Sequence, residues 1–276
     1  MAPDRSDREL WPPRDDAGMT DDVPPDQVAS EPPVAGIPAS VDVRELVMPL
    51  DIYQLDPVDL STISRAHLVL MADCLGRHGI EFEIPEPRPI PWARNEQRYG
   101  LTDEARAARH GYHVPEITDR PPLREPRLPD DIADECLAWA RRRLAQGAPD
   151  LPERRLADML SLRTFHLSRE DSRVRAAFSA WSRCMRQNGF SYPDPMAANN
   201  DVAFATEVPT EDEIRVAVAD VRCKRQVRVV EVWAAVEAAY QRQAIEAHRG
   251  PLELLRQAIQ VQLANAQAVL AGRHYR

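Results

Sequence analysis

Two stretches of the sequence share one pattern: Cys74-Leu-Gly-Arg-His-Gly79-Ile80-Glu-Phe82-Glu-Ile-Pro85 and Cys184-Met-Arg-Gln-Asn-Gly189-Phe190-Ser-Tyr192-Pro-Asp-Pro195. Counted from each cysteine, a glycine stands at +5, a large apolar residue at +6, an aromatic at +8 and a proline at +11. This spacing is typical of a helix that stops at a glycine and continues as an extended loop. A second cysteine follows each stretch on a predicted helix, Cys136 and Cys223. The sequence therefore predicts an internal repeat of two related helical halves.

Four cysteines allow three disulfide pairings. The repeat favours Cys74–Cys136 and Cys184–Cys223, because each half then closes on itself. On the chain-entropy model, closing loops of 62 and 39 residues contributes about 4 kcal/mol each to the free energy of unfolding. Inert buried thiols and a nucleophilic cysteine stay open as alternatives.

A zinc site is a further alternative for the first half. Cys74 and His78 share a helix face at i, i+4 and could recruit Cys136. The second half has Asn188 in the place of His78, which argues against a metal site repeated in both halves. We therefore expect neither a metal nor a cofactor.

Composition excludes several classes of protein. Of 276 residues, 43% are hydrophobic and 29% charged, as in soluble globular proteins. The net charge of −9 disfavours nucleic-acid binding. No apolar run reaches the roughly 18 residues of a membrane span. The 35 basic residues include a single lysine, Lys224.

The chain divides into three predicted segments. Residues 1–42 form a disordered acidic tail, because residues 1–40 carry eight prolines and nine acids but few apolar residues. Residues 43–150 form the first helical half with a proline-rich loop. Residues 151–276 form the second helical half and end in a long helical hairpin or kinked helix. The fold class is mainly α, with proline-rich loops over 82–92 and 115–130.

Caps and apolar periodicity predict the individual helices. Asp56-Pro57 begins one helix and Gly79 ends it, Gly147 ends another, and Thr210 with Glu213 forms a capping box. The helices expected are 57–78, 103–109, 131–146, 152–163, 171–188 and 210–270, the last with one break at Gly250-Pro251. One apolar stripe follows this break: Leu252, Leu255, Ile259, Leu263, Ala266 and Leu270.

The irregular connection after the first helix holds the candidate binding residues. Trp92 and Tyr99, with Arg94 and Arg98 alongside, form either an exposed aromatic binding face or a loop packed over the helices. No G-x-S-x-G, phosphate-binding or dinucleotide motif occurs, and we assign no catalytic residue.

Two histidines, His110 and His113, lie in a predicted loop three residues apart. As a metal site they would need a further ligand that the nearby sequence does not supply. They complete the candidate binding surface.

Several stretches resemble a family of secreted proteins and lipoproteins of actinobacteria without an established activity. They are Arg98-Tyr99-Gly100-Leu101, Gly111-Tyr112-His113, Trp181-Ser-Arg-Cys184-Met185, Gly189-Phe190, Ala219-Asp220-Val-Arg-Cys223-Lys224, Val232-Trp233, Glu237 and Tyr240-Gln241. The resemblance covers roughly residues 45–270. It implies an exported helical protein, and members commonly carry a signal peptide and a lipid-attachment cysteine that this sequence lacks.

These observations give one leading hypothesis and two alternatives. Structural disulfides persist outside the cytosol, so we expect a secreted or envelope-anchored binding protein whose export signal preceded Met1, with a lipid anchor in the precursor left open. Its partner would be an envelope protein or a glycan, not a nucleic acid. The alternatives are an envelope hydrolase that uses His110 or His113 in the 92–113 loop, and a cytosolic regulatory helical protein with free thiols.

Overall fold

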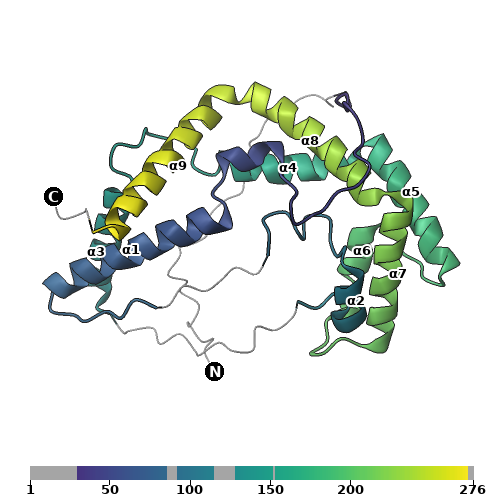
Figure 1. The fold of residues 1–276 in the computed structure, drawn as a ribbon, viewed down its shortest axis with the longest axis horizontal. Helices are drawn as coiled ribbons and strands as arrows, with labels where there is room; N and C mark the ends of the chain where they lie inside the picture. The colour runs from purple at the N-terminus through teal and green to yellow at the C-terminus, as the bar shows by residue number, and fades with distance from the viewer. Residues whose placement is uncertain (1–29, 86–91, 115–127, 152, 273–276) are drawn as a thin grey trace. The chain divides into compact units, whose positions relative to one another are not determined.

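The computed structural model describes residues 30–85, 92–114, 128–151 and 153–272, and within these ranges it contains helices and no strand (Figure 1). The α-helices are α1 (Pro57–Arg77), α2 (Glu104–His110), α3 (Asp130–Leu144), α4 (Leu156–Glu170), α5 (Ser172–Gln187), α6 (Pro195–Asn199), α7 (Glu211–Val227), α8 (Val229–Ala247) and α9 (Arg249–Leu270). Two short 3-10 helices accompany them, η1 (Pro49–Tyr53) and η2 (Val202–Phe204). The all-helical prediction is confirmed.

Local capping explains where these helices begin. The Asp56 side chain accepts a hydrogen bond from the Asp59 amide at the start of α1, and Asp103 caps α2 in the same way. Thr210 and Glu213 form the predicted capping box at the start of α7. Each cap satisfies amide groups that have no partner inside the helix.

Helices α1 and α5 end in the same geometry. Their C-cap residues, His78 and Asn188, have φ/ψ of −90°/5° and −92°/5°. The following glycines, Gly79 and Gly189, have φ of 75° and 88°, a region that favours glycine. Beyond each glycine, a backbone amide bonds to a carbonyl of the last helical turn at 3.0 Å. The shared pattern Cys-x4-Gly thus gives two equivalent helix ends, while duplication as its origin stays a prediction.

Both predicted disulfides are present. Cys74 on α1 is bonded to Cys136 on α3, with Cα atoms 5.5 Å apart. Cys184 on α5 is bonded to Cys223 on α7, with Cα atoms 5.7 Å apart. Each bond therefore joins two neighbouring helices of one half.

The last helix packs mainly against the first half of the chain. Figure 1 shows α9 beside α1, and the core between them is closed by α3. Ala266 and Val269 of α9 are buried there with Leu70, Cys74 and Cys136. The predicted boundary near residue 150 therefore does not separate two independent cores.

The second large core lies among α4, α5, α7 and α8. Trp233 of α8 is fully buried at its centre, and its ring contacts those of Phe165, Phe178 and Tyr99 at centroid distances of 5.0–5.1 Å. Its indole nitrogen donates to Ser168 Oγ at 2.8 Å. The aromatic cluster joins α4, α5 and α8 to the irregular connection that holds Tyr99.

Two sequence predictions differ from the structure, and two others fall wholly or partly outside the described residues. Residues 32–42, assigned to the tail, pack against the body: Arg173 donates to the Pro32 carbonyl at 3.0 Å, and Val34 and Val41 contact the second core. Residues 1–29, where most of the predicted disorder falls, lie outside the described residues. The proline-rich loops are described only in part, because residues 86–91 and 115–127 also lie outside. In the α9 stripe, Val269 is buried, whereas Leu270 is 40% exposed.

The long C-terminal helix is broken twice: once at His248, two residues before the predicted break at Gly250-Pro251, and once at Arg228, where the sequence predicts no break. Arg228 adopts left-handed backbone angles of 59°/42° and separates α7 from α8. His248 separates α8 from α9. Gly250-Pro251 lies inside the first turn of α9, where the missing proline N–H costs nothing because first-turn amides have no helical partner.

Loss of either disulfide should destabilise the fold. We expect the double variants Cys74→Ala/Cys136→Ala and Cys184→Ala/Cys223→Ala each to lose up to about 4 kcal/mol of unfolding free energy in urea titrations. Intact mass after alkylation serves as the control on the wild type. It should show no adduct on the unreduced chain and four after reduction, and an adduct before reduction would contradict the presence of two disulfides.

Candidate functional site

The irregular connection 92–101 is held by a buried carboxylate, Glu237 of α8. The side chain of Glu237 is fully buried. Arg98 donates to it from Nε at 2.9 and 3.0 Å and also from Nη2, and Tyr99 donates its hydroxyl to Oε2 at 2.9 Å. Arg98 Nη2 also reaches Ser161 Oγ of α4 at 3.0 Å. The connection is therefore fixed to two helices through one charged group.

The same carboxylate reaches η1 through a second side chain. Gln241, one turn further along α8, donates to Glu237 Oε1 at 2.9 Å and accepts from the Leu50 amide at 3.0 Å. Asn95, which is 2% exposed, donates to the Leu46 carbonyl at 3.0 Å and to Asp51 Oδ2 at 2.8 Å. The connection and η1 are thus held together from both sides.

The electrostatics of this group keep Arg98 charged and Tyr99 neutral. Burial lowers the pKa of Arg98, but hydrogen bonds and attraction from Glu237 outweigh it and leave the pKa above its usual value. Burial, reinforced by the Glu237 charge, raises the pKa of the Tyr99 hydroxyl well above its usual value. Arg98 and Glu237 are therefore a compensated buried ion pair with Tyr99 as a neutral donor.

A second buried network holds the other end of the connection. Lys224 of α7, the single lysine, donates to Asp220 Oδ2 at 2.9 Å and to the Leu101 carbonyl at 3.0 Å. Asp220 also accepts from Tyr112 and from the Trp181 indole, at 3.2 and 3.0 Å. Burial raises the Asp220 pKa, and the attraction of Lys224 opposes that rise. Both ends of 92–101 are therefore anchored in the protein interior.

His113 is bound at both ring nitrogens. Nδ1 lies 2.8 Å from Glu213 Oε1 and Nε2 lies 2.8 Å from the Thr206 carbonyl. Two acceptors are fully satisfied when the ring carries both protons. The Thr206 carbonyl and then Glu213 raise the His113 pKa above its usual value. Close approach to Glu213 also requires Gly111, since a Cβ there would lie 2.4 Å from Oε1.

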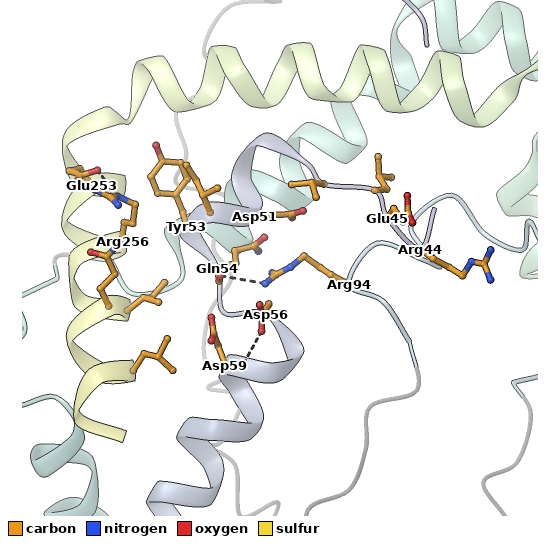
Figure 2. A pocket seen from close by; sticks show the side chains of 16 residues that line it. Arg44, Glu45, Asp51, Tyr53, Gln54, Asp56, Asp59, Arg94, Glu253 and Arg256 are labelled. Atoms are coloured by element: carbon orange, nitrogen blue, oxygen red, sulfur yellow. Dashed lines mark hydrogen bonds and ion pairs between the residues drawn. The ribbon is translucent and has the colours of Figure 1, made fainter. Parts of the chain in front are cut away.

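A pocket of about 830 Å³ lies where η1, the start of α1, the connection and α9 meet (Figure 2). Its lining includes Arg94 of the connection, Tyr53 and Gln54 at the end of η1, and Asp56 and Asp59 at the start of α1. The α9 wall is formed by Glu253, Arg256, Ile259, Gln260 and Leu263. Val47 and Ile52 add apolar surface and are 74% and 59% exposed.

Arg94 makes one long hydrogen bond with the residues around this pocket. Its Nη2 lies 3.4 Å from the Gln54 carbonyl, and Figure 2 shows the side chain directed towards Gln54 with Asp56 and Asp59 beyond. Within the described part of the chain no ion pair joins Arg94 to a carboxylate. By contrast, the arginines on either side of the pocket are paired, Arg44 with Asp42 and Arg256 with Glu253. The Arg94 guanidinium therefore has donors available to a ligand.

Asp59 is the complementary acceptor. Its Oδ atoms lie in a partly desolvated position beside Asp56, and burial followed by repulsion from Asp56 raises its pKa. The charge of Arg94 opposes this rise, so the two groups lie within electrostatic reach of each other. The pocket thus presents a hydrogen-bond donor and acceptors next to one another.

The structure divides the six residues of the predicted binding surface among different environments. Arg94 lines the pocket, whereas Arg98 and Tyr99 are the interior anchors described above and do not form an exposed face. Trp92 is half-buried under the Arg106 guanidinium, 5.0 Å from the ring centroid. The sequence left open whether the connection packs over the helices. Trp92, Arg98 and Tyr99 are packed in this way. His110 ends α2, and His113 binds Glu213.

The sequence analysis did not identify Glu237 as the buried partner of Arg98 and Tyr99, although the sequence around Glu237 contains an indication of it. Glu237 interrupts an otherwise apolar helical stretch, Val232-Trp-Ala-Ala-Val-Glu237-Ala-Ala-Tyr240. A carboxylate in such a stretch must be paired if the helix is buried on that face. The stretches that carry the family resemblance also meet here: Arg98-Tyr99 contacts Glu237, and Tyr112 contacts Asp220.

Comparison with known proteins does not add an assignment: no family model, no curated protein and no solved structure matches the chain.

Removing the charge of Glu237 should be costly. Glu237→Gln leaves the Arg98 guanidinium buried without a counter-charge, so we expect a loss of about 3–5 kcal/mol in unfolding free energy. The double variant Arg98→Met/Glu237→Leu removes both charges and should recover part of that loss. Urea unfolding with intact disulfides measures both variants, and a single variant no less stable than the double would contradict the ion-pair interpretation.

The His113 contacts should make stability depend on pH. Because the folded pKa is raised, the stabilisation is complete below the usual histidine pKa of about 6.5 and is lost as pH rises through the folded pKa. The difference in unfolding free energy between the wild type and His113→Asn should therefore shrink as the pH rises above about 6.5. Burial lowers the pKa of His67, so His67 also makes stability depend on pH. This contribution is the same in the wild type and in His113→Asn, and it cancels when the two unfolding free energies are subtracted. A difference that does not change with pH would exclude a protonated His113.

Proposed function

We propose that the protein is an exported binding protein, secreted or held at the cell envelope, that binds a neutral or amine-bearing saccharide in the Arg94 pocket. One observation carries the proposal: Arg94 presents unused donors beside the carboxylates of Asp56 and Asp59 in a pocket of about 830 Å³. Membership of the secreted actinobacterial family is part of the same proposal and rests on the sequence resemblance alone.

The chemistry of the cysteines supports the proposed location. The described residues contain two disulfides and no free cysteine, which is compatible with an oxidising compartment. Among the helices of the described residues, none has the length and apolarity to cross a membrane.

The ligand class follows from the groups that line the pocket. A sugar hydroxyl can accept from a guanidinium and donate to a carboxylate at the same time, so adjacent hydroxyls fit the pairing of Arg94 with Asp56 and Asp59. Tyr53 and Ile52 offer aromatic and aliphatic surface for the C–H face of a sugar ring. The lining holds five carboxylates against three arginines, which favours a neutral or amine-bearing ligand over an acidic one.

Binding is favoured over hydrolysis by the state of His113. Both of its ring nitrogens are engaged, with Glu213 and with the Thr206 carbonyl, so neither is available to accept a proton from a substrate. Neither His113 nor His110 is part of the pocket lining. The hydrolase hypothesis therefore has less support than the binding hypothesis.

Replacement of Arg94 tests the proposal. We expect titration calorimetry with neutral hexoses, amino sugars and their short oligomers to detect binding by at least one of them. Arg94→Ala should weaken that binding about 10- to 100-fold, the value of one or two charge-assisted hydrogen bonds. Arg94→Lys, which keeps the charge but not the fork of donors, should fall in between.

Arg215→Ala is the matched control, because Arg215 is an exposed arginine of α7 that does not line the pocket. It should bind like the wild type. No binding by any saccharide, or equal binding by wild type and Arg94→Ala, would refute the proposal. Capture of an envelope protein that depends on Arg94 would replace the saccharide by a protein ligand.

A further inference from the structure

The end of α1 brings a histidine to the first disulfide. Cys74 and His78 are one helical turn apart on the same face of α1, and Cys136 of α3 lies opposite. The two sulfur atoms and a ring nitrogen of His78 all lie within 4.8 Å of one another. Both cysteines are buried and His78 is exposed, so the group opens to solvent on one side.

We propose that, when the Cys74–Cys136 bond is open, these three side chains bind one Zn²⁺ and hold α1 to α3 through the metal. Cysteine and histidine are the ligands that zinc prefers in proteins, at about 2.3 Å for sulfur and about 2.0 Å for nitrogen. Tetrahedral coordination at these lengths separates the ligand atoms by about 3.5–3.8 Å. Opening the disulfide would let the two sulfur atoms rotate apart towards that separation, and water would complete the fourth position on the exposed side.

The zinc-bound form can arise from the free thiols of a new chain or from the disulfide after reduction. A newly made chain carries thiols, so zinc can bind before any oxidation, and each thiol releases one proton as it becomes a metal-bound thiolate. From the disulfide form, a dithiol or phosphine reductant supplies two electrons, and two protons complete the thiols. A dithiol reductant leaves as its own disulfide, and a phosphine as its oxide with the oxygen taken from water.

The second disulfide provides an internal comparison. Asn188 occupies the place of His78 with the same backbone angles, and its amide nitrogen lies 3.9 Å from Cys184 Sγ and 3.7 Å from Cys223 Sγ. A side chain at this position therefore reaches both sulfur atoms. Asparagine lacks the imidazole nitrogen that zinc prefers, so the reduced second half has two preferred zinc ligands where the first has three. The proposal is specific to the first half.

Zinc titration of the full chain tests this inference. The protein is reduced with excess phosphine, freed of metal, and titrated with Zn²⁺ against a chromophoric chelator. We expect one tightly bound zinc ion per reduced chain and none per oxidised chain. His78→Asn should weaken binding by at least about 100-fold, more than the loss of an outer-shell partner does. Asn188→His should create a second site of similar affinity.

Circular dichroism of the same samples separates site formation from unfolding. Zinc should raise the thermal midpoint of the reduced wild type and leave that of reduced His78→Asn unchanged. Cobalt in place of zinc should give thiolate-to-metal charge-transfer absorption in the wild type and not in His78→Asn. Equal zinc affinity of the two chains, or a reduced wild type that zinc does not stabilise, would overturn the proposal. These readouts do not depend on saccharide binding.

Discussion

The buried charge of Glu237 is the constraint on which the site depends. A carboxylate removed from water is costly unless donors replace its hydration. Glu237 obtains these donors from Arg98, Tyr99 and Gln241, which come from two separate parts of the chain. Gln241 in turn binds the backbone of η1. Satisfying one charge thus fixes the connection and η1 relative to α8, and these two segments place Arg94 and Tyr53 at the pocket.

Local sequence signals were sufficient to predict most helices but not the breaks between them. Asp56, Gly79, Asp103 and Thr210 act through neighbours within a few residues, so their caps could be predicted without knowledge of the fold. The break at Arg228 has no such signal, because an arginine in the left-handed region is disfavoured locally. The Arg228 side chain donates to the Pro38 carbonyl, 190 positions away, a contact that no local pattern indicates.

The candidate site could be predicted as a segment but not as a set of side chains. Arg94, Arg98 and Tyr99 were grouped because they are close in sequence and lie in a proline-bounded connection. In the structure these side chains point to different places. Arg98 and Tyr99 bind the buried carboxylate of Glu237, whereas Arg94 lines the pocket. The buried partner of Arg98 is Glu237, which lies 139 positions further along the chain. The local sequence of the connection does not indicate which of its arginines pairs with so distant a residue.

The two disulfides and the polar networks serve different parts of the fold. Each disulfide joins helices of one half, α1 to α3 and α5 to α7. Contacts between the halves include α9 packed on α1, α2 packed on α7, and the networks of Glu237 and Lys224 around the connection. The pocket lies along this non-covalent joint, between η1, α1 and α9. A ligand that bridges Arg94 and the α9 wall would therefore stabilise contacts that neither disulfide constrains, which couples its binding to the relative position of the two halves.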